Sequence, residues 1–136
     1  MKKASGLLLP LLLYLLAACA PPPPLTAQSV LGKFNVEGLK IAYIHSEERD
    51  PASPLPNSFS ERLAFSIPEI APKGGQVFIC DTKKNCDALY AYFDLLKGLA
   101  GPYLYQSPNG KVVVQLNSGL SPQTAARFED VVKSLP

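Results

Sequence analysis

The residues with the clearest chemical potential lie in one short stretch, FICDTKKNCDALY, which holds Cys80, Asp81 and Cys86. A thioredoxin-like redox site needs two residues between its cysteines at a helix start, and here five intervene. An aspartate directly after an apolar run can indicate a phosphoryl-accepting carboxylate, but Asp81 has no second carboxylate or glycine-rich phosphate loop beside it. We therefore interpret Asp81, Thr82 and Asn85 as a helix-capping turn.

A metal site in this stretch would have to recruit His45, the only histidine of the chain, together with Cys80, Cys86 and Asp81. A single histidine without a patterned ligand set is more often a strand residue at a rim. We assign no metal site, no cofactor and no catalytic residue. The lone histidine also weighs against an enzyme, because general acid-base catalysis would depend on carboxylates that show no pairing.

The N-terminus has the three parts of an export signal. Lys2 and Lys3 give a positive start, an apolar run follows from Leu7 to Leu16, and Ala17 and Ala18 supply small residues. The run spans about 12 residues through Ala18, whereas a membrane-spanning helix needs roughly 20. The segment 1–18 is therefore predicted to be a secretion signal.

The residues Leu16-Ala17-Ala18-Cys19 resemble the lipobox of bacterial lipoproteins. The resemblance implies cleavage before Cys19, which then carries a diacylglycerol thioether and usually an N-acyl chain such as palmitate. One acyl chain binds membranes only reversibly, so two or three give stable attachment without a spanning helix. In a host with two membranes, Ala20 after the cysteine implies sorting to the outer membrane. The alternative is an ordinary leader that happens to abut a cysteine.

The net charge argues against a nucleic-acid partner. The chain has 13 Lys and Arg against 11 Asp and Glu, and Lys2 and Lys3 leave with the leader, so the mature chain is neutral. With Cys19 lipidated, Cys80 and Cys86 are an even pair in an oxidising compartment. We favour a structural disulfide over free thiols, and closing so short a loop contributes about 2 kcal/mol.

The mature chain is long enough for one domain. Residues 19–28 are predicted to form the lipidated cysteine and a Pro-rich linker, in which Pro21 to Pro24 favour an extended conformation with a reach of about 25 to 30 Å. Residues 29–136 form the domain.

Hydrophobic periodicity predicts the elements of this domain. Strands are expected at 30–36, 39–45, 61–67 and 77–80, with a mobile polar loop at 46–58 whose charges are solvated and a central strand at 77–80 that is buried on both faces. A helix is expected at 83–100, then a hairpin of 103–106 and 111–117 around Ser107 to Gly110, then a helix capped by Ser121 and Pro122.

The order strand-helix-strand-strand-helix from Gln76 onward predicts the α+β class. We expect a two-layer sandwich, an antiparallel sheet with two helices on one face, in a ferredoxin-like core preceded by extra N-terminal strands. The strand from Glu61 to Ile67 is expected to take the edge position beside the central strand. Beyond the leader, the chain resembles no family.

Two surfaces are candidates for binding. The helix at 83–100 carries a second apolar stripe of Ala88, Tyr92, Leu95 and Leu99, wider than one sheet face requires, so either N-terminal segments or a partner covers it. Tyr103 and Tyr105 share one face of a strand and could form an aromatic platform for sugars or peptide, although cross-strand packing explains them as well.

These patterns favour a non-enzymatic lipoprotein of the bacterial cell envelope, held on the extracytoplasmic side of a membrane through Cys19. Its small domain would bind or scaffold a partner protein or a cell-wall component. The alternatives are an extracytoplasmic carrier of a small ligand, through Tyr103 and Tyr105, or of a metal, through His45 and the thiols. A small hydrolase or redox enzyme is the third.

Overall fold

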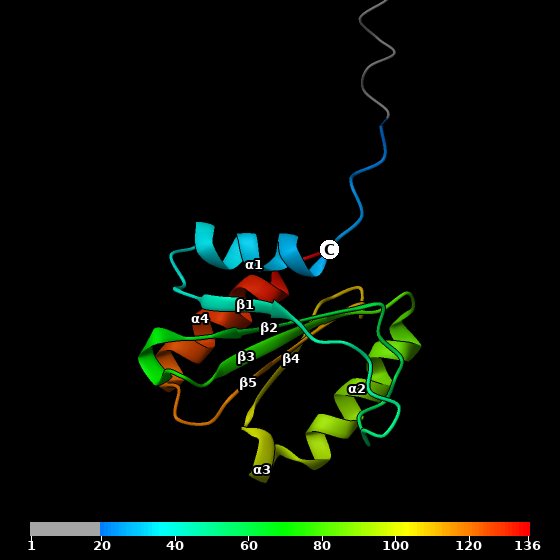
Figure 1. Ribbon diagram of the computed structural model, residues 1–136. Coiled ribbons are helices and arrows are strands. Elements are labelled where there is room, and N and C mark those ends of the chain that lie inside the picture. The colour runs from blue at the N-terminus through cyan, green and yellow to red at the C-terminus, as the bar shows by residue number, and fades with distance from the viewer. Residues whose placement is uncertain (1–19) are drawn as a thin grey trace, which may run out of the picture.

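The computed structural model describes residues 20–136, so the predicted signal peptide and Cys19 lie outside the described residues (Figure 1). An extended segment from Ala20 leads into the domain. The elements, in chain order, are α1 (Ala27–Val36), β1 (Ala42–Ser46), β2 (Glu61–Ser66), the 3-10 turn η2 (Pro68–Ile70), β3 (Gly74–Ile79), α2 (Lys83–Leu95), α3 (Lys97–Ala100), β4 (Tyr103–Gln106), β5 (Val112–Leu116) and α4 (Pro122–Lys133).

The α+β class and the antiparallel sheet are confirmed. The five strands lie in the order β1-β2-β3-β5-β4, and every neighbouring pair is antiparallel. From β3 onward the chain runs strand, helix, strand, strand, helix, with β5 between β3 and β4. On its other side β3 pairs with β2, as expected, but β2 is not an edge strand, because β1 pairs with its outer side.

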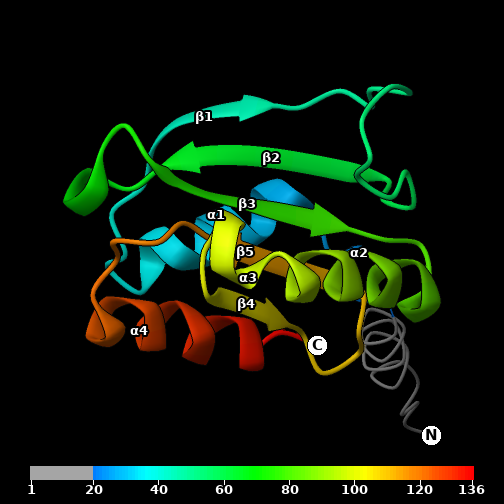
Figure 2. The ribbon, with the colours of Figure 1, turned by 90° about the horizontal axis from the view of Figure 1, so that it is seen from below.

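The expectation of two layers, with the helices after β3 and β5 on one face, is wrong. The helix α2 packs on one face of the sheet, whereas α4 packs with α1 on the other, as Figures 1 and 2 show. On β3, Val77 and Ile79 contribute to the core under α1 and α4, and Phe78 contributes to the core under α2. A strand that is apolar on both faces needs cover on both, so the helices divide between them.

The strand expected at 30–36 is also wrong, because this segment belongs to α1. The Thr26 hydroxyl accepts a hydrogen bond from the Ser29 N–H at 3.1 Å, and the Ser29 hydroxyl accepts one from the Thr26 N–H at 3.0 Å. This capping box starts a helix. The buried residues of α1 recur at helical spacing: Ala27, Val30, Leu31 and Phe34. The linker therefore ends at Thr26 rather than at Gln28.

The remaining elements follow the sequence pattern with local changes. The first strand starts later than expected, at Ala42, and its register with β2 is irregular between Ala42 and His45, where Tyr43 has a φ of 49°. The long helix breaks at Leu96 into α2 and α3. The hairpin of β4 and β5 is present, and the Ser121 hydroxyl accepts from the Thr124 N–H at 3.2 Å at the start of α4.

An aromatic cluster fastens α1 and α4 to the sheet. The ring centroids of Phe34 and Phe128 lie 4.9 Å apart in an edge-to-face arrangement, and those of Phe34 and Phe65 lie 6.1 Å apart. All three rings are buried. Such pairs add to the free energy that the burial of each ring already provides.

Replacing Phe128 with alanine should therefore lower the free energy of unfolding by about 3 to 5 kcal/mol, because the cavity lies between α4, α1 and the sheet. Urea unfolding followed by circular dichroism measures this change. The matched control is Val36→Ala in α1, whose side chain is 84% exposed and whose loss should cost less than about 0.5 kcal/mol. Equal losses for the two variants would contradict the described core.

Candidate interaction surface

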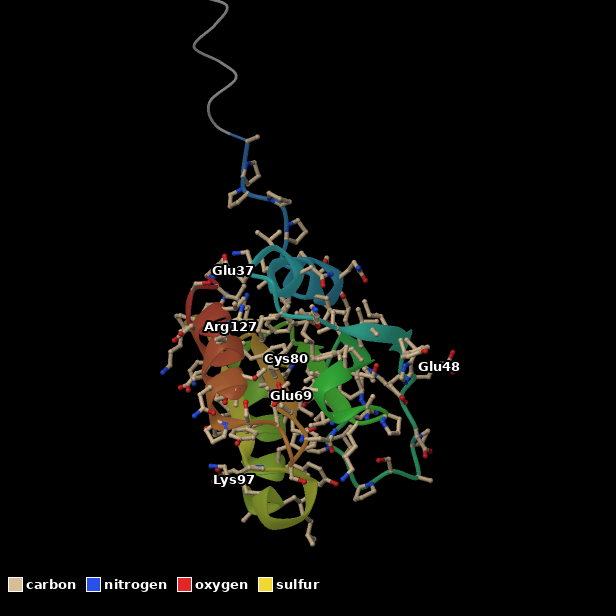
Figure 3. All side chains as sticks on the ribbon, turned by 90° about the vertical axis from the view of Figure 1, so that its left-hand side faces the viewer. Glu37, Glu48, Glu69, Cys80, Lys97 and Arg127 are labelled. Carbon is tan, nitrogen blue, oxygen red and sulfur yellow. A yellow bond between two sulfur atoms is a disulfide. The ribbon has the colours of Figure 1, made fainter. Side chains whose placement is uncertain are left out.

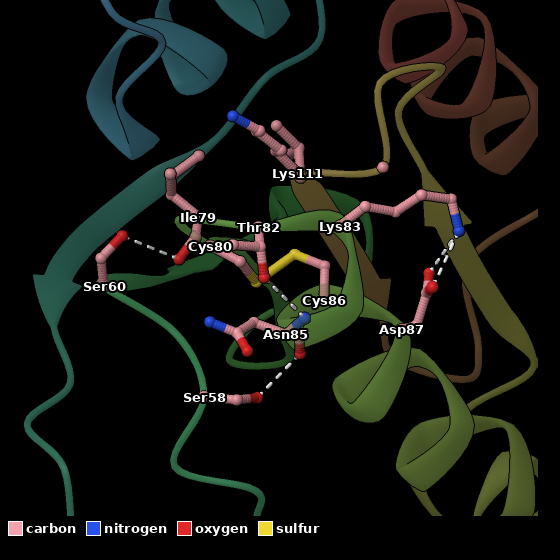
Figure 4. The surroundings of a disulfide bond; sticks show 12 residues. Ser58, Ser60, Ile79, Cys80, Thr82, Lys83, Asn85, Cys86, Asp87 and Lys111 are labelled. Atoms are coloured by element: carbon pink, nitrogen blue, oxygen red, sulfur yellow. Dashed lines mark hydrogen bonds and ion pairs between the residues drawn. A yellow bond between two sulfur atoms is a disulfide. The ribbon is translucent and has the colours of Figure 1, made fainter.

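The two cysteines of the domain join the end of β3 to the first turn of α2. Cys80 and Cys86 form a disulfide with 5.6 Å between their Cα atoms, and both are buried (Figure 4). The Thr82 hydroxyl accepts from the Asn85 N–H at 3.2 Å, which is the capping turn expected here, and Asp81 lies exposed beside it. The bridge thus holds the start of α2 against the central strand.

The candidate metal ligands are not brought together. His45 lies on the exposed edge strand β1, with Nδ1 3.0 Å from the Tyr43 carbonyl oxygen and Nε2 2.9 Å from Glu47 Oε1. These two hydrogen bonds raise the pKa of His45. Within residues 20–136 no three His, Cys, Asp or Glu side chains gather as a metal site would require, and the two sulfurs are bonded to each other.

Tyr103 and Tyr105 lie on the edge strand β4, on the face that α4 covers. Both are half-buried and pack against the core under α1 and α4. The Tyr103 hydroxyl donates to the Leu120 carbonyl at 3.0 Å, and Tyr105 lies opposite Val114 in the register of β5. The two rings are brought together, but as packing residues under a helix, which favours the cross-strand interpretation over an open platform.

The outer side of α2 carries apolar side chains that face water. Its inner residues Cys86, Leu89 and Phe93 are buried against the sheet. The α1 helix cannot cover the outer side, because it lies on the opposite face of the sheet. Leu95 and Leu99 are 86% and 88% exposed.

Exposed alanines continue this apolar surface along α2. We define the α2–α3 patch as the exposed residues Ala88, Ala91, Leu95 and Leu99. Tyr92, which the sequence pattern also placed on this stripe, is instead partly buried against the small core under α2. Lone exposed apolar residues are common, whereas two leucines four residues apart in the chain, both almost fully exposed, indicate a contact surface.

The patch lies at the end of the domain away from the N-terminal segment. In Figure 3 the extended segment leaves at the top, next to α1, and Lys97 marks the far end. Lys97 Nζ pairs with Asp94 Oδ1 at 2.6 Å, and this hydrogen bond raises the pKa of Lys97. A solvated ion pair therefore borders the leucines where the helix breaks.

The position of Tyr105 predicts a difference in alkaline stability. Burial, with smaller contributions from Glu129 and Tyr103, raises the pKa of Tyr105 from 10.0 to about 12. Between these values the unfolded chain loses the phenol proton and the folded chain keeps it, so the free energy of unfolding falls as the pH rises. Tyr105→Phe should remove the contribution of this phenol to the decrease in the free energy of unfolding. Urea unfolding from pH 9 to about 12 measures the difference. Identical alkaline limbs for the two proteins would contradict the described burial.

No helix within residues 20–136 is long and apolar enough to cross a membrane. The chain matches no family model, no curated protein and no solved structure. Its function therefore has to be argued from its own residues.

Proposed function

We propose that the protein is a lipid-anchored lipoprotein of the bacterial envelope whose small domain binds a partner protein through the α2–α3 patch. The anchor rests on the lipobox-like residues that end at Cys19 and on the Pro-rich segment after them. The disulfide between Cys80 and Cys86 is compatible with an oxidising compartment outside the cytoplasm.

The exposure of Leu95 and Leu99 carries the proposal of a binding surface. Burying a leucine side chain stabilises a complex by roughly 1.5 to 3 kcal/mol. The two leucines lack this stabilisation while they face water. The neighbours Ala88 and Ala91 are small, and a Cβ atom added at Gly98 would meet no atom within 4 Å. A helix of a partner can therefore approach this surface closely.

The place of the patch favours a protein over the anchoring membrane. Pro22, Pro23 and Pro24 border a hollow with Ile79, Lys111 and Pro136, so the segment that leads from the anchor runs along one end of the domain. Lys97, which lies between Leu95 and Leu99 in the chain, is at the opposite end (Figure 3). A domain held in this orientation presents the leucines away from its own bilayer.

The role that we propose is binding rather than catalysis. The single histidine, His45, is 60% exposed on an edge strand and is engaged by Tyr43 and Glu47. Asp81 is exposed next to the disulfide and is explained by the turn before α2. Neither residue lies beside a candidate nucleophile in the hydrogen bonds of residues 20–136.

Attachment through Cys19 predicts a simple change in location. Cys19→Ser should leave the protein outside the membrane fraction, because no acyl chain can be attached. Detergent phase partitioning of cell envelopes, with mass spectrometry of the mature N-terminus, measures both points. A Cys19→Ser protein that stays in the membrane fraction, or a mature form without lipid, would contradict the anchor.

Contact through the patch predicts the loss of a specific complex. In envelope preparations treated with a crosslinker, Leu95→Gln with Leu99→Gln should reduce the adduct with the partner by about tenfold or more, since each leucine contributes a kilocalorie or more on burial. The melting temperature should not change, because both side chains are exposed.

The matched control is Val36→Gln, an equally exposed apolar residue outside the patch, which should leave the adduct intact. An adduct that persists in the double variant would overturn the proposed surface. An adduct of twice the mass of the chain would show a second copy instead of a partner.

A further inference from the structure

A second surface feature, independent of the patch, is an arginine held in place without an acidic partner. Arg62 on β2 is half-buried, and its Nε donates to Gln76 Oε1 at 2.9 Å. Its guanidinium carbon lies 5.5 Å from the centroid of the Phe78 ring. Within residues 20–136 no carboxylate lies within 4.0 Å of its nitrogens, and its Nη atoms make no hydrogen bond.

A chain of side-chain amides fixes the orientation of Arg62. The Gln76 amide donates to Gln115 Oε1 at 3.0 Å, and the Gln115 amide donates to the Ala100 carbonyl at 2.7 Å. Because each amide nitrogen donates along the chain, the oxygen of Gln76 is left to face Arg62. Gln115 is 3% exposed, so the chain is anchored in the interior. The guanidinium is thus oriented before any ligand arrives, which reduces the entropic cost of binding.

The free side of Arg62 opens into a concave surface that holds a second arginine. Two adjoining hollows of about 500 and 170 Å³ lie between the end of β1, the loop after it and the start of β2. Both are lined by Arg49 and Arg62, and the Arg49 guanidinium lies 5.3 Å from the centroid of Phe59. Arg49 also has no carboxylate within 4.0 Å among the described residues.

Acidic residues line the same hollows and limit the ligand. Glu47 is engaged by His45, and one oxygen of Asp50 accepts from the Ala52 N–H at 2.9 Å. Glu48 lines both hollows and makes no ion pair within residues 20–136; Figure 3 places it at the outer edge of the domain. A multiply charged anion would be repelled by these carboxylates, whereas a ligand with one carboxylate and one ammonium group would match both signs.

We propose that these hollows bind the free carboxylate of a short peptide, with Arg62 as the main contact. A guanidinium presents paired donors that match the two oxygens of a carboxylate. Arg49 adds a second donor group, and Glu48 accepts from the peptide ammonium. The Phe59 ring and the Leu55 side chain contact the apolar part of the peptide. This site goes beyond the partner-binding patch and needs none of its residues.

Peptides with and without charged ends test the site. The full lipoprotein in detergent micelles is titrated with trialanine, with trialanine amide and with inorganic phosphate, and amide proton and nitrogen shifts are followed by NMR. We expect saturable shifts around residues 47–62 with trialanine, and affinity reduced by about tenfold or more for the amide, because it lacks the carboxylate.

Arginine variants separate a specific contact from general charge. Arg62→Lys keeps the charge and should weaken trialanine binding by about tenfold or more, because lysine lacks the paired donors. The matched control is Arg127→Lys. This arginine donates to the carbonyl of Glu37, the residue after α1, and lines neither hollow, so the variant should leave the affinity unchanged.

Three results would overturn the proposal. These are equal binding of the acid and the amide, unchanged binding in Arg62→Lys, and the absence of saturable shifts at about 10 mM peptide. Phosphate that binds as tightly as trialanine would show a general anion site and would also contradict it. Because these readouts use no partner protein, they stand or fall apart from the proposed function.

Discussion

The burial of β3 and β5 on both faces is the constraint on which the rest of the structure depends. Val77 and Phe78 are neighbours on β3, point to opposite faces and are both fully buried; Val112, Val113 and Val114 repeat this on β5. Such strands need an apolar cover above and below the sheet. The helices α1 and α4 supply one cover through the phenylalanine cluster. On the other face α2 lies alone, and Leu55 and Phe59 of the loop after β1, together with Arg62 of β2, complete the cover around Phe78.

This unequal cover explains where the two proposed binding surfaces lie. With α1 and α4 side by side, their face of the sheet is closed, and Tyr103 and Tyr105 are drawn into its core. The helix α2 on the other face has an outer side that nothing in the described chain covers; Leu95 lies exposed at its end, and Leu99 is exposed on α3. Where α2 does not reach, polar side chains meet the sheet, so an arginine is held on an aromatic ring beside a hollow.

Local signals were sufficient for the elements whose structure is local. The Asn-Gly turn before β5, the Ser121-Pro122 start of α4 and the spacing of Cys80 and Cys86 each involve a few neighbouring residues. The segment 30–36 fits a period of two as well as a helical period, and only the capping pair Thr26 and Ser29 decides between them. The face that each helix covers depends on the whole sheet. No sequence pattern indicated the orientation of Arg62. This orientation depends on Gln76, 14 residues away, and the orientation of Gln76 depends on Gln115, 39 residues further along the chain.

We propose that a lipid-anchored domain presents its α2–α3 patch to a partner protein. To test this, a photoreactive amino acid is placed at position 99 in living cells and, for comparison, at position 36, which is similarly exposed on α1. We expect a discrete protein adduct from position 99 and none from position 36, with both variants in the membrane fraction. Adducts of equal yield from the two positions, or adducts to lipid alone from position 99, would contradict it.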